Sequence, residues 1–555
     1  MKQIDKVAIS DHKNNFRFCF KSEHYLLSVL VLALVTLYFY LVRPEIAGLW
    51  YDDGVYLLGA KALASGHGYR LLSEAGWPAI VKYPPLLSVL LAPIWWLNHN
   101  FPTNLIGCKA LNIGFGLGTL GLVYLLARRA FGLRKGWALL AMLILGLHPV
   151  WLILVTEVMS EPLYLLLSLA LSFLTLRIHQ RGSPPTTTEQ RLCILLSVLT
   201  FYTRTIGITL ILGVGFWLWR KFGRHTALRY LIPCIVLCSL WFVWTASQPA
   251  GIFNVGHIYV ASYNLTYFQE LLLEIIKAQG LAPLFWNNLT LLPASLIGSI
   301  FPYLSGIEHL KSLLPFLILP FLVGLVITCV RLFRQMPSPA FCYVFFYLLA
   351  CLCWYANDQY PRLLIPILPF LWIGLLKAWS HFAERFLGKS GLRQILSTVI
   401  ALVALVSLEP WQIPGLPRGN AMANNAGPEL WQDYQATFAA IAELSQPQDI
   451  FWSRYSSLYP LYTNRMVISR NLIPSAQAFS SGELNQGPKA IGQLLLPVFN
   501  HEQVRYVLLE PLITGHHVAN PVDQATLNIL QSAPEHFQPV YTSPHGYISI
   551  YQYLP

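Results

Sequence analysis

Residues 49–69 read LWYDDGVYLLGAKALASGHGY, and residues 81–87 read VKYPPLL. Asp52 and Asp53 lie only a few residues beyond a long apolar run. A carboxylate pair at the edge of a membrane costs free energy unless it is solvated or paired. Two adjacent acids, a lysine and two prolines in such a place therefore indicate a polar functional site.

The composition predicts a membrane protein with many spans. The chain has 555 residues, of which 55% are hydrophobic and 11% charged, and its mean hydropathy is +0.52. Soluble domains average about 25% charged residues, so a soluble globule of this size would lack charges for its surface. The net charge of +12 does not indicate nucleic acid, because Lys and Arg lie in short clusters between apolar runs. Such clusters mark cytoplasmic loops.

Apolar runs of roughly 20 residues predict about eleven membrane helices. Five lysines and arginines precede the first run, which places the N-terminus in the cytoplasm and makes this run an anchor rather than a cleaved signal. The expected spans are 25–42, 103–127, 136–153, 160–177, 191–203, 205–219, 228–247, 312–330, 340–355, 361–380 and 393–408.

The loops expected in the cytoplasm are all basic, and they are 127–136, 177–191, 220–229, 331–335 and 377–393. This alternation of charge supports the topology. Residues 281–303 are also apolar, but a span there would place the basic loop 331–335 outside. We therefore expect 281–303 to be re-entrant or interfacial.

The region after residue 410 has a different character. An amphipathic helix is predicted at 429–444, and alternating patterns predict strands at 449–453, 465–469, 504–509 and 547–553. The expected division is a membrane domain at 1–410, with an outer first loop at 43–102, and an α/β domain at 411–555 outside the cytoplasm.

Ionisable residues from five segments are expected near the membrane on the outer side. They are Asp52 and Asp53; Lys82; Glu157 and Glu161; Arg204; and Asp358 and Arg362. A single acid at a helix end is usually a cap or a solvated residue. Five segments that bring charges to the same leaflet indicate an enclosed polar cavity.

One chemistry that needs this arrangement is sugar transfer from a polyprenyl phosphate. A carboxylate would deprotonate the acceptor hydroxyl as it attacks the anomeric carbon. Cations would hold the departing phosphate, with Lys as a point charge and Arg as a bidentate fork. The acids and the cations should then divide the cavity between them.

The segment LWYDDGVYLLGAKAL at 49–63 resembles the first-loop signature of the GT-C superfamily, polytopic glycosyltransferases that use lipid-phosphate sugars. It is most similar to the protein O-mannosyltransferase-like family and the lipid A aminoarabinose transferases, of glycosyltransferase families 39 and 83. The resemblance covers about residues 25–410 and implies a GT-C fold. In these families an acid pair is followed by a tyrosine, an amphipathic juxtamembrane helix and Pro-Pro.

The resemblance also implies roles. Asp52 would be the catalytic acid of the first loop, with Asp53 beside it, and Glu161 in MSEPLY (159–164) the second catalytic acid. The implied donor-phosphate ligands are Lys82 in VKYPP, Arg204 in FYTRTIG and Arg362 in QYPRLLIPILP. The supporting residues are Tyr56, Tyr83, Glu157 and Asp358, and Tyr83 can also be read as an interfacial belt residue.

The resemblance and the charge pattern also give expectations for the cofactor, the partners and the location of the protein. Val81 stands where the aminoarabinose transferases have a glutamate that is a proposed metal ligand, so a divalent metal stays possible but unassigned. The expected partners are a polyprenyl-phosphate sugar, an acceptor that is a lipid, a glycan or a protein, and membrane lipids, with no nucleic acid. The expected location is a bacterial plasma membrane, with the catalytic face outside and inversion at the anomeric carbon. A transporter or lipid flippase and an inactive lipid-sugar binder are the alternatives.

Overall fold

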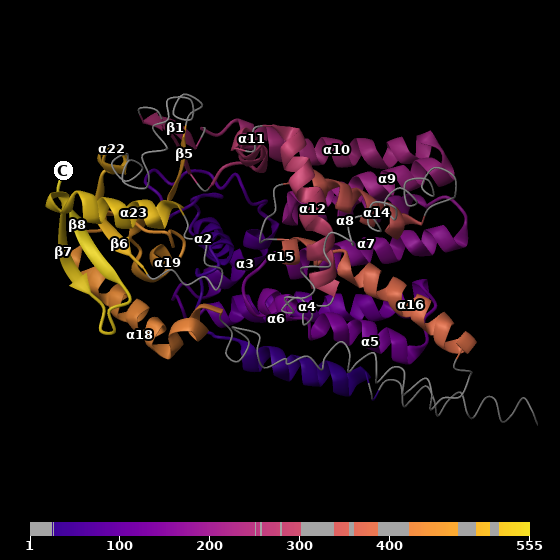
Figure 1. Cartoon of the computed structure of the whole chain (residues 1–555). Coiled ribbons are helices and arrows are strands. Elements are labelled where there is room, and N and C mark those ends of the chain that lie inside the picture. Colours follow the sequence, from indigo (N-terminus) through magenta and orange to yellow (C-terminus); the bar gives the residue numbers. More distant parts are fainter. Residues whose placement is uncertain are drawn as a thin grey trace, which may run out of the picture.

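The computed structural model describes residues 25–300, 338–386, 421–474, 495–510 and 521–555, apart from 26, 250, 256, 257, 263, 278, 279 and 355–359. Apolar helices form a bundle on one side, and a mixed α/β domain that contains the C-terminus lies on the other (Figure 1). We call the described residues from 421 onward the C-terminal domain. This arrangement confirms the mainly helical fold class with a C-terminal α/β region that the sequence predicts.

The membrane half begins with an apolar helix at Leu27–Leu41. The helices that follow it are α2 (Asp52–Ala64), α3 (Leu86–Leu97), α4 (Leu105–Leu125), α5 (Lys135–Gly146), α6 (Pro149–Thr156), α7 (Glu161–Arg181), α8 (Thr187–Thr203), α9 (Ile208–Phe222), α10 (Arg224–Ala246), α11 (Tyr267–Lys277), α12 (Leu281–Ile300), α14 (Pro339–Cys353), α15 (Tyr360–Leu364) and α16 (Leu368–Phe386). Short π and 3₁₀ turns, η1 (Leu126–Ala130) and η2 (Thr205–Gly207), extend α4 and precede α9.

Four helices in the described residues are long and apolar enough to cross a membrane: Leu105–Ala130, Glu161–Arg181, Thr205–Phe222 and Arg224–Ala246. Helices α5 and α6 form a fifth candidate, bent by 65° at the break between them. The apolar helices Leu27–Leu41, Pro339–Cys353 and Leu368–Ser380 are shorter and coincide with other predicted spans. The predicted spans 312–330 and 393–408 lie outside the described residues.

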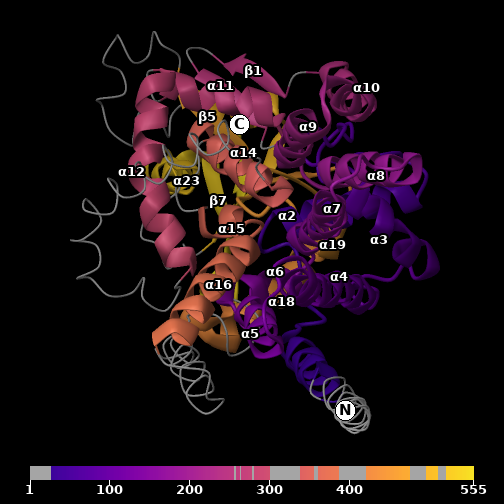
Figure 2. The same ribbon diagram turned by 90° about the vertical axis from the view of Figure 1, so that its right-hand side faces the viewer.

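The segment 281–303 contains α12, a single helix from Leu281 to Ile300. It crosses the direction of α9 and α10 instead of running along them (Figures 1 and 2), and it packs against α14, α15 and α16. An unbroken helix differs from the re-entrant form of the prediction, while its crosswise course agrees with the interfacial form.

Close approach of α4 to its neighbours depends on small residues. A Cβ added at Gly116 would lie 2.2 Å from Val155, and one at Gly118 would lie 3.0 Å from Leu166. Glycines at these positions therefore let α4 pack tightly against α6 and α7, as small residues do between membrane helices.

The C-terminal domain is built on a five-stranded mixed sheet in the order β4-β3-β6-β8-β7. Its elements are α18 (Ala421–Leu444), β3 (Ile450–Trp452), α19 (Tyr459–Thr463), β4 (Met466–Ile468), α22 (Leu495–His501), β6 (Val504–Leu509), α23 (Pro521–Ser532), β7 (Phe537–Thr542) and β8 (Ser549–Tyr553). Strand β3 is parallel to β4 and β6, whereas β8 is antiparallel to β6 and β7. All four strands that the alternating pattern predicts, and the helix at 429–444, are present.

A second sheet joins the two halves of the chain. Strands β1 (Ile252–Val255) and β2 (Ile258–Ser262) follow α10, and β5 (Arg470–Pro474) comes from the C-terminal domain. Strand β2 pairs antiparallel with both, in the order β1-β2-β5. Sequence patterns did not reveal these strands, and β5 ties the segment beyond residue 411 to the membrane half.

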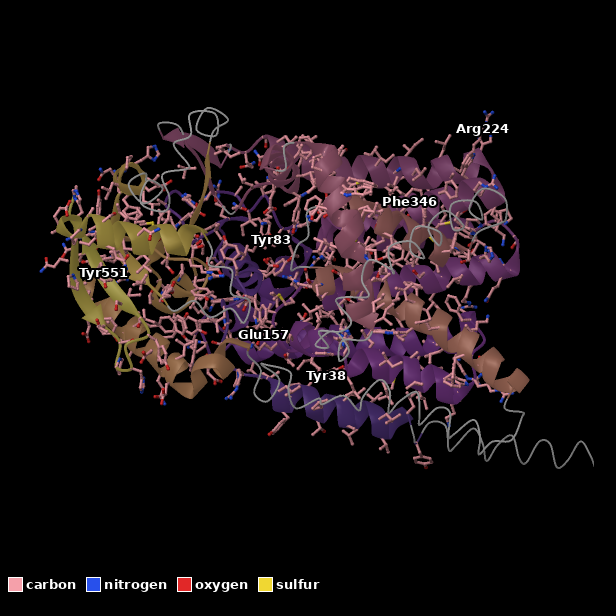
Figure 3. The ribbon with its side chains drawn as sticks, viewed as in Figure 1. Tyr38, Tyr83, Glu157, Arg224, Phe346 and Tyr551 are labelled. Atoms are coloured by element: carbon pink, nitrogen blue, oxygen red, sulfur yellow. The ribbon has the colours of Figure 1, made fainter. Side chains whose placement is uncertain are left out.

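Helices α2 and α3 lie between the bundle and the C-terminal domain (Figure 1). Residues 54–64 follow the acid pair, where the resemblance implies an amphipathic helix along the membrane interface. They are helical, but most of α2 is buried against α3 and α19 instead of lying on an open interface. Figure 3 shows Tyr83 and Glu157 in this junction and Arg224, from the basic loop 220–229, at the opposite end of the bundle. The first loop and the basic loop thus lie at opposite ends, as the charge pattern predicts.

Candidate functional site

The acid pair begins helix α2 after an unusual turn. Tyr51 has φ 64° and ψ −58°, and the amide of Asp52 donates a 2.8 Å hydrogen bond to the carbonyl of Trp50. This is a γ-turn of the rare form, which is strained for a residue with a side chain. The turn places Asp52 and Asp53 in the first turn of α2, where negative charge is favoured by the helix dipole.

Asp53 faces the backbone of this turn. Its carboxylate accepts hydrogen bonds from the amides of Gly48, at 2.6 Å, and Trp50, at 3.2 Å, and the residue is 1% exposed. Burial raises the pKa of Asp53, although the amide of Gly48 works in the other direction. Asp53 therefore holds the shape of the turn, and it is Asp52 that turns toward the other candidate residues.

Asp52 lies between a cation and a phenol. The Nη2 atom of Arg362 lies 2.6 Å from its Oδ2, and the hydroxyl of Tyr83 donates a hydrogen bond to its Oδ1. Burial works to raise the pKa of Asp52, but Arg362 and Tyr83 outweigh burial, so the pKa lies below its ordinary value. Asp52 is therefore ionised at neutral pH.

Glu161 binds the same arginine from the other side. Nε of Arg362 donates to Oε1 of Glu161, and Nη1 of Arg204 lies 2.5 Å from the same oxygen. Arg204 also donates to Oγ of Ser160, at 3.1 Å. The result is an alternating chain of Asp52, Arg362, Glu161 and Arg204, which we call the acid–arginine cluster. Its four charges cancel, as a buried ionic network requires.

Burial within this cluster is uneven. The side chain of Glu161 is 1% exposed, whereas those of Asp52, Arg204 and Arg362 are 14%, 19% and 20% exposed. Oε2 of Glu161 is buried and has no hydrogen-bond partner among the described residues. An unsatisfied carboxylate oxygen in such surroundings costs free energy, so a hydrogen-bond donor that reached this oxygen would lower the cost of burying Glu161.

Lys82 lies next to the cluster and has its own acid. Its Nζ is 3.0 Å from Oε1 of Glu270 on α11, and its side chain is 5% exposed. The ammonium also lies 5.9 Å from the ring centres of Tyr83 and Tyr267, within the range of cation–π attraction. Asn264 accepts a hydrogen bond from the amide of Lys82, at 3.4 Å.

Glu157 belongs to a different pair. Nζ of Lys109, on α4, lies 2.7 Å from Oε2 of Glu157, and the two side chains are 0% and 2% exposed. Asn112 donates to the carbonyl of Glu157, at 2.5 Å. This pair lies on the side of Asp53, whose carboxyl group feels the charge of Lys109. Glu157 lies between the end of α6 and the start of α7, so the pair connects this break to α4. The pair does not join the acid–arginine cluster.

The structure thus brings together most of the residues that the sequence singled out. Asp52, Glu161, Arg204 and Arg362 form one network, Lys82 and Tyr83 border it, and Tyr56 lies with its ring centre 5.3 Å from that of Tyr83. Asp358 lies outside the described residues. The expected division of acids from cations is not observed, because each arginine lies against a carboxylate.

Sequence reasoning missed three residues that border the site, and they are Asn264, Tyr267 and Glu270. It also missed Lys109, the partner of Glu157. Lys109 stands in the first turns of a predicted span, where an intramembrane charge is itself a functional signal. Glu270 lies on the amphipathic helix α11, and the stretch 248–269 before it contains no acid. A single acid on an amphipathic helix looks like part of an ordinary solvated face. Nothing local to the sequence connects Glu270 with Lys82.

A divalent metal needs several acidic, histidine or cysteine ligands close together. No three His, Cys, Asp or Glu side chains within the described ranges lie close enough together to share a metal ion. The aliphatic side chain of Val81 supplies no metal ligand either. The described residues therefore do not fit a metal centre.

No protein-family model matches this chain, and no curated protein matches it in sequence. In structure, the chain is similar to ArnT from Cupriavidus metallidurans in the apo state, with 13% sequence identity, a TM-score of 0.49, and coverage of 96% of this chain and 98% of that chain. For the same protein bound to undecaprenyl phosphate, the identity is 13%, the TM-score 0.48, and the coverage 95% and 98%.

The chain is also similar to the oligosaccharyltransferase of Archaeoglobus fulgidus tethered with an acceptor peptide. The sequence identity is 12% and the TM-score 0.48, with 96% of this chain and 74% of that chain covered. In all three comparisons the similarity extends over nearly the whole of this chain.

Proposed function

We propose that this chain is an integral-membrane glycosyltransferase, which moves a sugar from a polyprenyl-phosphate donor to an acceptor hydroxyl on the extracytoplasmic face. The observation that carries the proposal is the acid–arginine cluster. Helices α2, α7 and α15 and the α8–α9 turn each contribute one charge to it. Charges at the end of an apolar bundle are expensive and indicate a functional site.

The cluster contains both kinds of group that the reaction needs. Asp52 takes the proton of the acceptor hydroxyl while the hydroxyl oxygen forms a bond to the anomeric carbon. The bond from that carbon to the phosphate oxygen breaks, and its electron pair stays on the polyprenyl phosphate. Arg204 and Arg362 stabilise the charge that develops there. Attack from the face opposite the phosphate inverts the anomeric carbon.

The ion pairs of the free protein have to open before this can happen. Arg362 now lies against both Asp52 and Glu161, so a donor phosphate would take over part of its hydrogen-bonding capacity. Asp52 then loses its nearest cation, and its pKa rises toward a value useful for a base. Glu161 contacts both arginines through Oε1 and keeps them in place.

The test measures product and donor binding on one sample. The full-length protein in nanodiscs is incubated with radiolabelled polyprenyl-phosphate sugars and with lipid, glycan and peptide acceptors. We expect product from the unmodified protein. Asp52→Asn is expected to lower turnover by about 10²- to 10⁴-fold, the usual effect of losing a general base. Donor binding should persist, because the phosphate ligands are other residues.

Asp449→Asn is the matched control. Asp449 lies in the C-terminal domain, 3.2 Å from Nη1 of Arg505, and accepts a 2.8 Å hydrogen bond from the amide of Gln446. The same chemical change there should leave turnover near normal. Near-normal product from Asp52→Asn would refute the assignment of Asp52. Movement of the lipid across the membrane without any glycosidic product would instead support a transporter or flippase.

A further inference from the structure

We infer that the C-terminal domain is a working part of the candidate site. By two routes it holds the turn that presents Asp52 and the backbone that carries Lys82. The inference rests on the proposed function and deepens it by naming positioning residues that lie far from the acids and cations in the sequence.

The first route is a close backbone contact. A Cβ at Gly48 would lie 2.7 Å from Cα of Leu458, and a Cβ at Gly54 would lie 2.6 Å from Oγ of Ser457. Ser457 also donates a 3.3 Å hydrogen bond to the carbonyl of Gly48. Only glycine lets the C-terminal domain approach this closely on both sides of the acid pair.

The same segment secures the chain that enters the turn. The hydroxyl of Tyr462 accepts a 3.0 Å hydrogen bond from the amide of Ala47 and donates a 2.7 Å bond to the carbonyl of Glu45. The strained conformation of Tyr51 follows a few residues later. Strained backbone persists only where its surroundings hold it, and here the C-terminal domain supplies part of that hold on Asp52.

The second route begins with a buried arginine on β5. Nη1 of Arg470 lies 2.8 Å from Glu74 of the first loop, and Nη2 lies 3.1 Å from Glu502. Arg470 is 8% exposed, so both pairs are held in a desolvated place. In the β2–β5 ladder, Arg470 is also the register partner of Ser262.

The relay then continues from Ser262 to the candidate site. Ser262 donates to Glu74, at 3.3 Å, and accepts from the amide of Asn264, at 3.1 Å. Oδ1 of Asn264 accepts hydrogen bonds from the amides of Val81, at 3.0 Å, and Lys82, at 3.4 Å. Its Nδ2 donates to the carbonyl of Ala79, at 2.7 Å. Asn264 thus clips the segment that carries Lys82.

Both routes end on backbone next to a candidate catalytic or binding group. Catalysis depends on placing such groups to within about 0.5 Å, and supporting hydrogen bonds supply that accuracy. Ser262 and Asn264 are therefore positioning residues, since they would act on the donor through Lys82 and do not touch the reacting atoms.

The experiment cuts the relay in the full-length protein. Ser262→Ala removes one hydroxyl between Arg470 and Asn264 with little change in volume. Ser168→Ala is the matched control, because Ser168 is also buried and its partners, the carbonyl of Leu165 at 3.1 Å and the side chain of Tyr343, lie within the helical bundle and outside the relay. Hydrogen–deuterium exchange is measured for the amides of Val81 and Lys82, and donor KM and kcat are measured separately.

In Ser262→Ala, exchange at residues 81 and 82 should become about 5-fold faster, the effect of weakening one ordinary hydrogen bond. In the same variant, donor KM should rise more than kcat falls. Asn264→Ala should give a larger increase in exchange and a larger rise in donor KM than Ser262→Ala. Exchange and KM in Ser262→Ala that equal those of Ser168→Ala would overturn the relay. An unmodified protein without transferase activity would refute the proposed function, and the exchange measurement would still decide the relay.

The contact route has its own test. Gly54→Ala should lower kcat because its Cβ meets Ser457, and the added change Ser457→Gly should restore part of the loss. Restoration by the second change supports a positioning contact between the two segments. Equal loss in the single and double variants would overturn it.

Discussion

Replacing Glu270 by glutamine is expected to tighten donor binding. In the free protein the ammonium of Lys82 is neutralised by Glu270, with Nζ and Oε1 3.0 Å apart. If the donor phosphate binds Lys82, it has to displace this carboxylate first. Glu270→Gln removes the negative charge but keeps the size and shape of the side chain, so Lys82 becomes available at less free-energy cost.

The magnitude follows from the burial of the pair. The side chains of Lys82 and Glu270 are 5% and 19% exposed, so water screens them only in part. A hydrogen bond to a charged group contributes roughly 1.5–3 kcal/mol. A glutamine oxygen keeps some of it, so we expect donor affinity to rise by about 10-fold, equivalent to about 1.4 kcal/mol. Loss of the ion pair between Lys82 and Glu270 should also lower the thermal stability of the free protein.

The assay measures the binding of polyprenyl phosphate to the protein in nanodiscs, at two salt concentrations. Glu189→Gln is the control, since Glu189 pairs with Arg181 in a more exposed place, at 2.7 Å, and lies in a loop predicted to be cytoplasmic. Its affinity for the donor should equal that of the unmodified protein. Lys82→Met should weaken binding, and the double variant with Glu270→Gln should bind no better than Lys82→Met alone.

Two results would refute this reasoning. Unchanged or weaker binding by a folded Glu270→Gln variant would mean that Lys82 and Glu270 stay paired in the complex. Tighter binding by the double variant, relative to Lys82→Met, would mean that Glu270 acts on the donor without Lys82.

Three further predictions concern the network around these groups. Because the pKa of Asp52 is lowered, Asp52 should stay ionised above about pH 4, and its contribution to stability should be complete there. The pH profile of kcat/KM should therefore show no loss from Asp52 between pH 7 and 5. The stability that Asp52 contributes should be lost only as the pH falls through the pKa of the folded state. Tyr83→Phe removes a hydrogen bond from Asp52 and should shift the acid limb of the pH–rate profile to higher pH, with turnover about 5-fold lower at neutral pH. Lys109→Met should lower the free energy of unfolding by about 3–5 kcal/mol by leaving Glu157 buried and unpaired, and adding Glu157→Gln should recover part of it in thermal unfolding.

Local chemistry in the sequence determined many of the helices and strands of this protein, although it did not reveal β1, β2 or β7. Apolar runs with basic flanks predict the helices of the bundle, and alternating patterns predict β3, β4, β6 and β8, because both depend on the spacing of side chains along one segment. The motif around Asp52 and the charged residues near predicted span ends located most of the candidate site. The break between α5 and α6 also has a local signal that the predicted span 136–153 passed over, because Pro149 stands at the start of α6 and a proline cannot continue the preceding helix.

Only the tertiary structure decided which charges meet. Glu161 and Arg362 are 201 residues apart in sequence, and Lys82 and Glu270 are 188 apart, yet each pair is in contact. The sequence shows that acids and cations gather at one end of the bundle, but an ion pair depends on distances of a few ångströms between separate segments. For the same reason Asp52 and Asp53, neighbours in the chain, differ: the backbone of the turn binds the carboxylate of Asp53, and Arg362 binds that of Asp52.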